Sequence, residues 1–470
     1  MADNIAGFPM VMSVSDKAIN AQLNRVYGQS THEKEMFPHV PWNFGPDDLS
    51  WGVSVEEFEA PQVDFDTDIK GGCRLLMTIK RGQYTSDTIK RYKDKDGKIH
   101  KKIESVSLEL GNMTIAVTTP MRQIKHPTWS DENFEVQALF ADLENVHRVD
   151  VDLSKNPKVA HSGSIKADLE TLFKDQIEAL GEKYPAGSEG ALLFGAVKKP
   201  LIPKAAQSSG PLKPSASTYS TFRSPQAPAP YKEGELEYML LIDDDTTFPT
   251  GGTVGVMDKS LLLTDKKATL VVSDTILLEK VMKPLLEKAY PKIKLKVEPG
   301  DMFAGRKAKL HLTESYEFGM DINDHSRTAH LTKADVVIDG NKFRMDYHID
   351  TSVYQAVKDL DATIDGYQEI ILTDKGGTFD IKINAPEPDH HVDDPPLGLR
   401  ILFDILTVGF NELALKLSTD SAGDDMDNDA QKMLTDTKLA LTSFLLPGKA
   451  VWNYDTSVLD GHLYVAANYE

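Results

Sequence analysis

The chain is almost free of cysteine. Among its 470 residues only Cys73 carries a thiol, which excludes an intramolecular disulfide and any multi-cysteine zinc or iron–sulfur site. Folding in a reducing compartment is the simplest interpretation. Because Cys73 opens a strand-like run, we interpret it as a small core residue rather than a nucleophile.

Long hydrophobic runs are also missing. No stretch reaches the roughly 18 uncharged apolar residues of a membrane span, and the closest, Leu397 to Leu417, is interrupted by Arg400, Asp404, Glu412 and Lys416. The N-terminus, MADNIAGFPM, has an acidic residue where a signal peptide needs a basic one. We therefore predict no transmembrane segment and a cytoplasmic protein, with release that needs no signal peptide as the alternative.

Positive charge is scarce, and catalytic motifs are absent. The 52 Lys and Arg residues against 72 Asp and Glu give a formal net charge of −20. This argues against nucleic-acid binding, because phosphate contacts need Lys and Arg in excess. The chain has no H-E-x-x-H motif and no phosphate-binding P-loop, and Ser188 lacks the first glycine of a nucleophile elbow. We therefore expect a protein that is not an enzyme and has no catalytic residues.

One acidic cluster invites a metal interpretation. Asp425, Asp427 and Asp429 alternate like the first ligands of a calcium loop, and Asp436 stands where the twelfth would be. Ala430, however, occupies the position that needs glycine for the sharp turn. We predict a solvated acidic loop that also places carboxylates at the start of the following helix. Whether the loop around Asp427 binds calcium stays open.

A second cluster places His390 and His391 among three aspartates. Adjacent side chains of an extended segment point in opposite directions, so the two imidazoles cannot easily share one ion. We predict a surface loop here, and no metal site in the chain.

One short pattern occurs twice. Val14-Ser15-Asp16 follows a short apolar run and opens an amphipathic stretch, and Val272-Ser273-Asp274 does the same near mid-chain. In both copies the apolar residues keep the spacing of one helical face, and Ser or Asp can cap the first helical turn. Pro284 is the exception to this match. The pattern predicts an internal duplication of a strand, a cap and a helix.

A segment of different composition divides the chain. Residues 203–233, which begin PKAAQSSGPLKPS, are rich in Pro, Ser and Ala and nearly free of aliphatic side chains. Such a segment cannot bury enough apolar surface to offset its ordering entropy. We predict a flexible or extended linker between a first module, residues 1–202, and a second, residues 234–470. A long ordered surface loop is the alternative.

Both halves are dominated by antiparallel β patterns. Alternating or β-branched runs such as SVSLELG and ATLVVSD predict strands, and hairpins are centred on Asp339-Gly340 and Gly376-Gly377. Sequential strands indicate meanders rather than βαβ crossovers. Periodicity also predicts three later helices, at Ile165 to Leu180, Leu397 to Leu417 and Ala430 to Leu445. The fold class is therefore α+β, with long helices laid on antiparallel sheets.

The two ends of the chain carry a family resemblance. GFPMVMSVSDKAINAQLNRVY, with Ile19-Asn20 in its helix, and the Phe-x-x-Pro-Gly turn of Phe444, Pro447 and Gly448 resemble the 47-kDa accessory proteins encoded beside clostridial botulinum neurotoxin genes and their bacterial relatives. Where relatives carry Trp after the first glycine, this chain has Phe8. The resemblance implies two modules of the tubular lipid-binding (TULIP) fold, each with a long helix packed on a curved antiparallel sheet.

The same resemblance implies a function. TULIP modules leave an apolar groove between helix and sheet, so we expect a lipid-binding or lipid-handling protein that holds an acyl chain there. It would have no cofactor other than a bound lipid or fatty acid. The alternative is a scaffold for other toxin-cluster proteins whose groove is filled by side chains. The groove residues we predict on the two repeated helices are Leu23, Val26, Tyr27, Val281, Leu285 and Leu286.

One segment carries a net positive charge, opposite in sign to the net charge of the chain. Between Lys80 and Lys102, nine Lys and Arg residues stand against three aspartates, and Asp96-Gly97 predicts a hairpin turn. Such a hairpin, with Tyr92 and Ile99 interspersed, can contact an anionic membrane surface. The alternative is a solvated hairpin kept soluble by its lysines. The membrane-contact residues we predict are Lys93, Lys95, Lys98 and Lys101.

Overall fold

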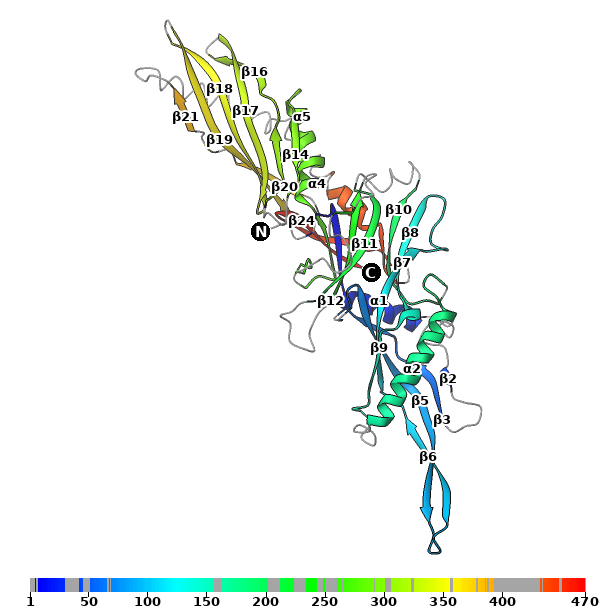
Figure 1. Ribbon diagram of the computed structural model, residues 1–470. Helices are drawn as coiled ribbons and strands as arrows, with labels where there is room; N and C mark the ends of the chain where they lie inside the picture. The colour runs from blue at the N-terminus through cyan, green and yellow to red at the C-terminus, as the bar shows by residue number, and fades with distance from the viewer. Residues whose placement is uncertain are drawn as a thin grey trace.

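Three antiparallel sheets follow one another along an elongated molecule (Figure 1). One sheet lies at one end, and a long two-stranded hairpin projects at the other. The computed structural model describes residues 5, 7–29, 42–44, 51–65, 67, 69–155, 163–188, 190–201, 212–223, 234–242, 248–249, 260–263, 265–290, 292–300, 306–322, 325–355, 358–377, 379–384, 386, 389–392, 432, 434–447 and 450–469.

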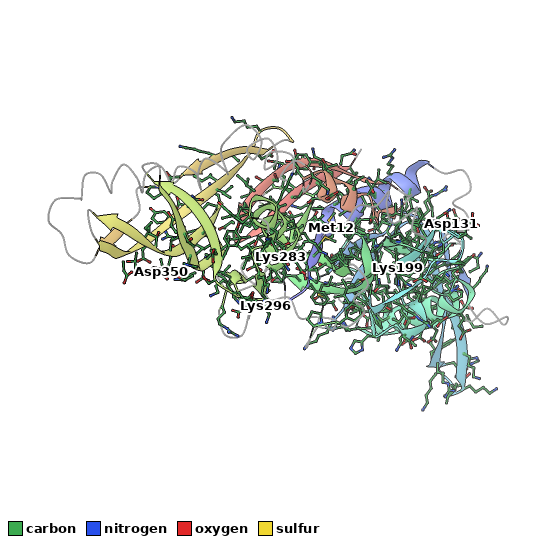
Figure 2. All side chains as sticks on the ribbon, turned by 90° about the horizontal axis from the view of Figure 1, so that it is seen from above. Met12, Asp131, Lys199, Lys283, Lys296 and Asp350 are labelled. Carbon is green, nitrogen blue, oxygen red and sulfur yellow. The ribbon has the colours of Figure 1, made fainter. Side chains whose placement is uncertain are left out.

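The central sheet has six strands and joins both ends of the chain. Its order is β11-β12-β1-β13-β24-β23. Met10 pairs with Leu240 on one side and Val272 on the other, so the two apolar runs of the repeated pattern lie next to each other. Figure 2 shows Met12 in this middle part of the molecule. The strands are β1(Met10–Ser15), β11(Pro214–Arg223), β12(Gly234–Ile242), β13(Ala268–Val272), β23(Trp452–Asp460) and β24(His462–Tyr469).

The second sheet has ten strands and carries the longest described helix. α2(Gly163–Lys183) buries Leu169, Phe173 and Ile177, in agreement with the predicted apolar face, and Trp42 packs between Phe58 and Phe173. A short 3₁₀ turn, η2(Leu143–Asn145), lies against α2. The strands are β2(Trp42–Phe44), β3(Trp51–Phe58), β4(Gln62–Asp64), β5(Gly72–Lys93), β6(Ile99–Glu109), β7(Thr114–Lys125), β8(Phe134–Ala141), β9(Arg148–Asp152), β10(Leu193–Pro200) and β22(Phe444–Leu445).

The third sheet, which we call the distal sheet, has eight strands. The predicted hairpins are confirmed: Asp339 pairs with Lys342 around Gly340, whose φ is 59°, and Asp374 pairs with Phe379. Asp350 marks this end of the molecule in Figure 2. The strands are β14(Leu295–Glu298), β15(Lys309–Leu312), β16(Tyr316–Ile322), β17(His325–Asp339), β18(Lys342–Gln355), β19(Lys358–Asp374), β20(Phe379–Asn384) and β21(Asp389–Val392).

The repeated Ser-Asp pattern caps a helix in both places. At α1(Asp16–Gln29), the Ala18 N–H donates to Ser15 Oγ at 3.2 Å. In the second copy, the Ile276 N–H donates to Ser273 Oγ, also at 3.2 Å. The second helix is less regular, because it runs through α4(Asp274–Leu277), a π-helical turn η3(Leu278–Met282) and α5(Lys283–Ala289). The predicted caps are confirmed, whereas the duplication itself stays a prediction.

Part of the predicted linker is an ordered strand. Residues 214–223 form β11, which pairs along its length with β12, and the Tyr219 hydroxyl donates to the Met121 carbonyl. These ten residues therefore form an ordered, extended strand and not a flexible linker. The module boundaries at 202 and 234 stay a prediction, and the central sheet draws strands from both sides of them.

Several sequence predictions fall on residues outside this description. The predicted helix Leu397 to Leu417 lies outside the described residues, as do Asp425, Asp427 and Asp429. The predicted helix from Ala430 to Leu445 is confirmed for residues 434–441, whereas Phe444 and Leu445 form strand β22 instead. The surface loop predicted at His390 and His391 is wrong, because Asp389–Val392 form strand β21, which pairs with β19. In the described ranges, no helix is long and apolar enough to cross a membrane, and no group of three His, Cys, Asp or Glu side chains is placed to hold a metal ion.

Candidate functional site

The basic segment forms a free two-stranded arm (Figure 1). β3 pairs with β5 only as far as Ser86, and beyond that residue β5 pairs with β6 alone, ending in the pair Lys93 and Ile99. The seven further residues of β5 extend the arm by roughly 20 Å at the usual rise per strand residue. The predicted hairpin is therefore confirmed, and we call residues 87–107 the arm.

The turn at the arm's tip is fixed by one aspartate. Asp94 Oδ1 accepts the backbone N–H groups of Asp96 (3.0 Å) and Lys98 (2.8 Å), and Gly97 has a φ of 82°, which favours glycine. Asp94 Oδ2 lies 2.6 Å from His100 Nε2. The bond from His100 and those from the turn amides hold the pKa of Asp94 below its usual value. Asp94 thus orders the turn that presents the lysines.

The four predicted lysines all lie on this arm and are exposed. Within the described residues, none of their ammonium groups forms an ion pair, whereas neighbouring Lys102 lies 3.3 Å from Glu104. Their charge is therefore directed to solvent at the far end of an otherwise acidic molecule. The lysines are Lys93, Lys95, Lys98 and Lys101.

The arm also carries exposed apolar side chains. Tyr92 is 53% exposed and stacks on His100 at 5.5 Å between ring centroids. Ile99 and Ile103 are each 64% exposed. The contribution of Ile103 was missed from the sequence; its position two residues from Lys101 in a strand was the available signal.

The strand register sorts these side chains onto two faces. Directly paired residues share a face, as do alternate residues of one strand. Lys93 pairs with Ile99 and Arg91 with Lys101, so three cations share one face with the two isoleucines. Tyr92 and His100, which pair with each other, lie on the opposite face. The first face, which we call the isoleucine face, combines positive charge with exposed aliphatic surface, as an anionic membrane surface would require.

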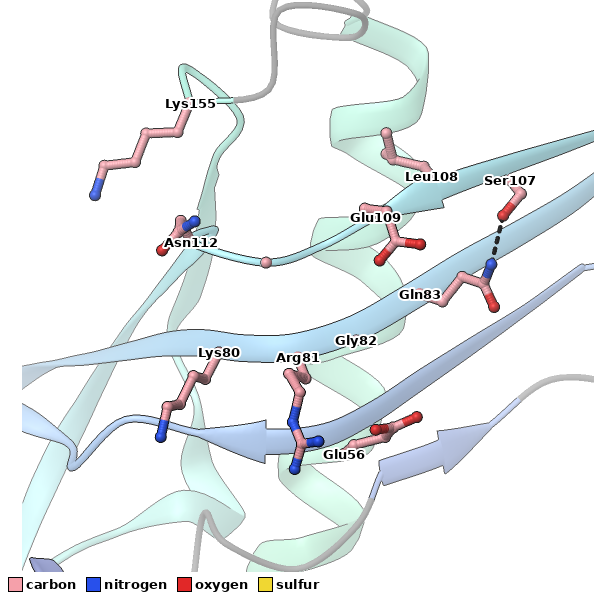
Figure 3. A pocket seen from close by; sticks show the side chains of 11 residues that line it. Glu56, Lys80, Arg81, Gly82, Gln83, Ser107, Leu108, Glu109, Asn112 and Lys155 are labelled. Atoms are coloured by element: carbon pink, nitrogen blue, oxygen red, sulfur yellow. Dashed lines mark hydrogen bonds between the residues drawn. The ribbon is translucent and has the colours of Figure 1, made fainter.

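A polar cavity of about 830 Å³ lies at the base of the arm (Figure 3). Lys80 and Arg81 line it and share the carboxylate of Glu57, at 2.6 Å and 2.7 Å, which lowers the pKa of Glu57 through the Lys80 bond first and then through Arg81. Gln83 donates to Ser107 Oγ at 2.6 Å. The lining is polar and carries both signs of charge, so it does not suit an acyl chain.

The predicted groove residues lie in or against the main hydrophobic core. Leu23, Tyr27 and Leu286 are buried in one continuous cluster, and Val26 and Val281 are partly buried against it. The side chain of Leu285 lies outside the described part of the structure. At the three buried positions an acyl chain would have to displace protein side chains.

The single thiol is inert in this fold. Cys73 is fully buried in β5, and burial raises the pKa of its thiol. This placement agrees with the interpretation of Cys73 as a core residue, because only an accessible thiolate is reactive.

The fold is similar to that of two solved proteins. The structure of P47 from Clostridium botulinum A2 matches with a TM-score of 0.64 at 10% identity, over 99% of this chain and 98% of that one. P47 of Clostridium botulinum E1 matches with a TM-score of 0.59, also at 10% identity, over 99% of both chains. No protein-family model and no curated protein sequence matches the chain. At this identity the likeness shows the fold, and it confirms the expected TULIP-like α+β architecture.

Proposed function

We propose that the protein binds lipid and docks on anionic membrane surfaces through the isoleucine face of the arm. One observation carries this proposal: two isoleucines, each 64% exposed, share a face with Arg91, Lys93 and Lys101. Burying an aliphatic side chain of this size stabilises a complex by roughly 1.5–3 kcal/mol. Each cation near an anionic surface adds about 1 kcal/mol. No catalytic step belongs to this function.

The arm is suited to the interface rather than the bilayer core. Beyond Ser86 its outer edges have no strand partner among the described residues, and unpaired backbone groups are costly in hydrocarbon. Docking therefore places the isoleucines at the boundary of the acyl region and leaves the backbone among the headgroups. The acyl chain of a bound lipid would occupy an apolar interior of one of the modules, as the TULIP-like fold suggests.

The alternative function is a scaffold for other toxin-cluster proteins. It is favoured by the burial of Leu23, Tyr27 and Leu286 in the core, because filled positions leave no room for a ligand there. In that case the arm would contact an acidic protein surface instead of lipid.

Vesicle co-sedimentation tests the proposal with two arm variants. The first changes Lys93, Lys95, Lys98 and Lys101 to Glu, and the second combines Ile99→Ser with Ile103→Ser. We expect both to lose most binding to phosphatidylglycerol vesicles, and the parent to bind phosphatidylcholine vesicles poorly. A matched control changes four exposed lysines elsewhere to Glu and should bind much more than the first variant: Lys292, Lys296, Lys382 and Lys432. Folded arm variants that sediment like the parent would show that the arm is only a solvated hairpin.

A further inference from the structure

The polar cavity at the base of the arm lies on the same side of the sheet as the isoleucine face. β5 and β6 keep one regular antiparallel register from the base of the arm to its tip, so alternate residues of each strand share a face. Gln83, Ser107 and Glu109, which line the cavity, therefore lie on the face of Ile99 and Ile103. Ser107 is about 13 Å along the strand from Ile103. A membrane surface that contacts the isoleucine face thus also faces the cavity.

The other side of the sheet is closed at this level. Tyr84 and Leu108 pair with each other there, and both are buried in the main hydrophobic core. Gln83 and Ser107, next to them in the chain, are exposed. The cavity side is therefore the side from which a ligand can approach the base of the arm.

Two irregularities in strand pairing direct charged side chains to this cavity. β3 and β5 lose their one-to-one pairing at Glu56 and again at Lys80, each of which is left without an opposite residue. Such bulges change the direction of side chains. As a result, the adjacent residues Lys80 and Arg81 reach the same carboxylate, that of Glu57, instead of pointing to opposite faces. Glu56 and Lys80 both line the cavity.

One cation and one carboxylate of the lining form no ion pair with another described residue. They are Lys155, which is exposed, and Glu56, which is half-buried. Figure 3 shows them on opposite sides of β5, with Asn112 beside Lys155. Lys80 and Arg81, by contrast, already share Glu57. The cavity therefore presents one positive and one negative charge that do not neutralise each other.

A zwitterionic group fits this lining better than a group of one sign. A purely anionic group would meet Glu56 and Glu109, and a purely cationic group would meet Lys155. Among the described residues that line the cavity, none is aromatic, so the ring faces that recognise a quaternary ammonium are missing. A primary ammonium instead donates up to three hydrogen bonds, which carboxylates accept, and a phosphate accepts from lysine. These requirements describe a phosphoethanolamine group.

We propose that this cavity binds the phosphoethanolamine headgroup of a phospholipid whose acyl chains stay in the membrane. Lys155 binds the phosphate, and Glu56 accepts hydrogen bonds from the ammonium. The inference rests on the proposed membrane docking, because the isoleucine face brings the cavity to the lipid surface. It adds selectivity to that function: the arm binds an anionic surface of any composition, whereas the cavity recognises ethanolamine.

Vesicles with a constant phosphatidylglycerol content test the site. Their remaining phosphatidylcholine is replaced by phosphatidylethanolamine, and co-sedimentation is measured before and after the replacement. We expect the parent to bind about fivefold more tightly afterwards, which is the gain expected from two exposed ion pairs. Glu56→Gln and Lys155→Gln should each lose most of this gain.

Glu56→Gln also separates a headgroup contact from general electrostatics. Removing a negative charge should strengthen binding to an anionic vesicle if only the charge of the protein matters. Loss of the ethanolamine contact should instead weaken binding to the vesicles that contain phosphatidylethanolamine. Glu182→Gln, at an exposed position of α2, is the matched control and should keep the full gain.

A soluble headgroup tests the same site without a membrane. Saturation-transfer NMR should detect glycerophosphoethanolamine on the parent protein and give a much weaker signal for glycerophosphocholine. The glycerophosphoethanolamine signal should fall in Glu56→Gln and in Lys155→Gln. Because no bilayer is present, a change in lipid packing cannot produce this result.

The outcomes separate this site from the proposed function. A parent that binds phosphatidylglycerol vesicles without any gain from phosphatidylethanolamine would overturn the headgroup site alone. A gain that persists in both cavity variants would overturn it as well, as would equal NMR signals from the two soluble headgroups. Failure of the parent to bind phosphatidylglycerol vesicles would instead count against the arm, and the NMR comparison would still decide the cavity.

Discussion

Asp16 and Asp274 each begin the helix that follows one of two paired strands, β1 and β13. Each also accepts a hydrogen bond from a backbone N–H that is distant in the sequence. Asp16 Oδ2 accepts the Gly234 N–H at 2.9 Å, and Asp274 Oδ2 accepts the Ala308 N–H at 3.0 Å. Each follows a capping serine, and both carboxylates are buried. Each aspartate therefore ties the start of a helix to a backbone segment far along the chain.

Removing one of these carboxylates should destabilise the fold. Asp274→Ala leaves the buried Ala308 N–H without its acceptor, and a hydrogen bond to a charged group contributes about 1.5–3 kcal/mol. We expect a loss of that size in the free energy of unfolding in urea, and a similar loss for Asp16→Ala. The control is Asp175→Ala on the exposed side of α2, which should change stability by less than about 0.5 kcal/mol. Equal stability of all three variants would contradict the tethering role.

Membrane binding by the arm should have an electrostatic part, which salt weakens, and an apolar part, which salt leaves in place. Raising ionic strength from about 0.01 M to 0.15 M shortens the screening length from roughly 30 Å to 8 Å. Binding to phosphatidylglycerol vesicles should therefore weaken sharply, leaving a remainder that depends on Ile99 and Ile103. The Ile99→Ser, Ile103→Ser variant should lose this remainder, as measured by co-sedimentation at both salt concentrations. Salt-independent binding of the parent would exclude an electrostatic contact.

The local features of this fold were predictable because they depend on short-range chemistry. Ser15 and Ser273 cap helices through bonds to the third following residue, and the Asp96-Gly97 turn needs only a positive φ at glycine. Strand β11 was missed because Pro and Ser dominate its neighbourhood. Its Thr, Tyr and Phe residues favour a strand only once β12 supplies a partner along the whole segment.

The candidate sites were predictable only in part, because they depend on the register of paired strands and on which side chains pack or form hydrogen bonds together. The positive charge of the arm could be predicted from its lysines. The isoleucine face could not, because it depends on the register of the two strands, in which Lys93 pairs with Ile99. A leucine in a core and a leucine in a groove look alike in sequence, so Leu23 could not be assigned. Glu56 and Lys80 read as ordinary surface charges until the irregular pairing of β3 and β5 is seen.

Glu369, on the outer surface of the distal sheet, should make the free energy of unfolding depend on pH in the acid range. Glu369 is bonded by Lys342 and by Asn384 Nδ2 (3.0 Å), and these bonds, that of Lys342 first, lower the pKa of its carboxyl below 4.5. A carboxyl whose pKa is lower in the folded state stabilises the fold above its unfolded pKa and loses this contribution as pH falls. The free energy of unfolding should therefore fall less steeply below about pH 4.5 in Glu369→Gln than in the parent. Identical pH profiles would contradict this assignment.

The packing of α2 on the turn η2 should depend on the absence of a side chain at Gly181. A Cβ at this position would lie 2.5 Å from the carbonyl carbon of Leu143 and 2.6 Å from its oxygen, and backbone atoms cannot move aside as a flexible side chain can. Gly181→Ala should therefore lower the free energy of unfolding by about 1–3 kcal/mol, although alanine alone favours a helix by up to about 1 kcal/mol. Gly163→Ala is the control, since a Cβ there meets no atom within 4 Å, and it should be neutral or stabilising. A Gly181→Ala protein as stable as the parent in urea would show that α2 does not approach Leu143 this closely.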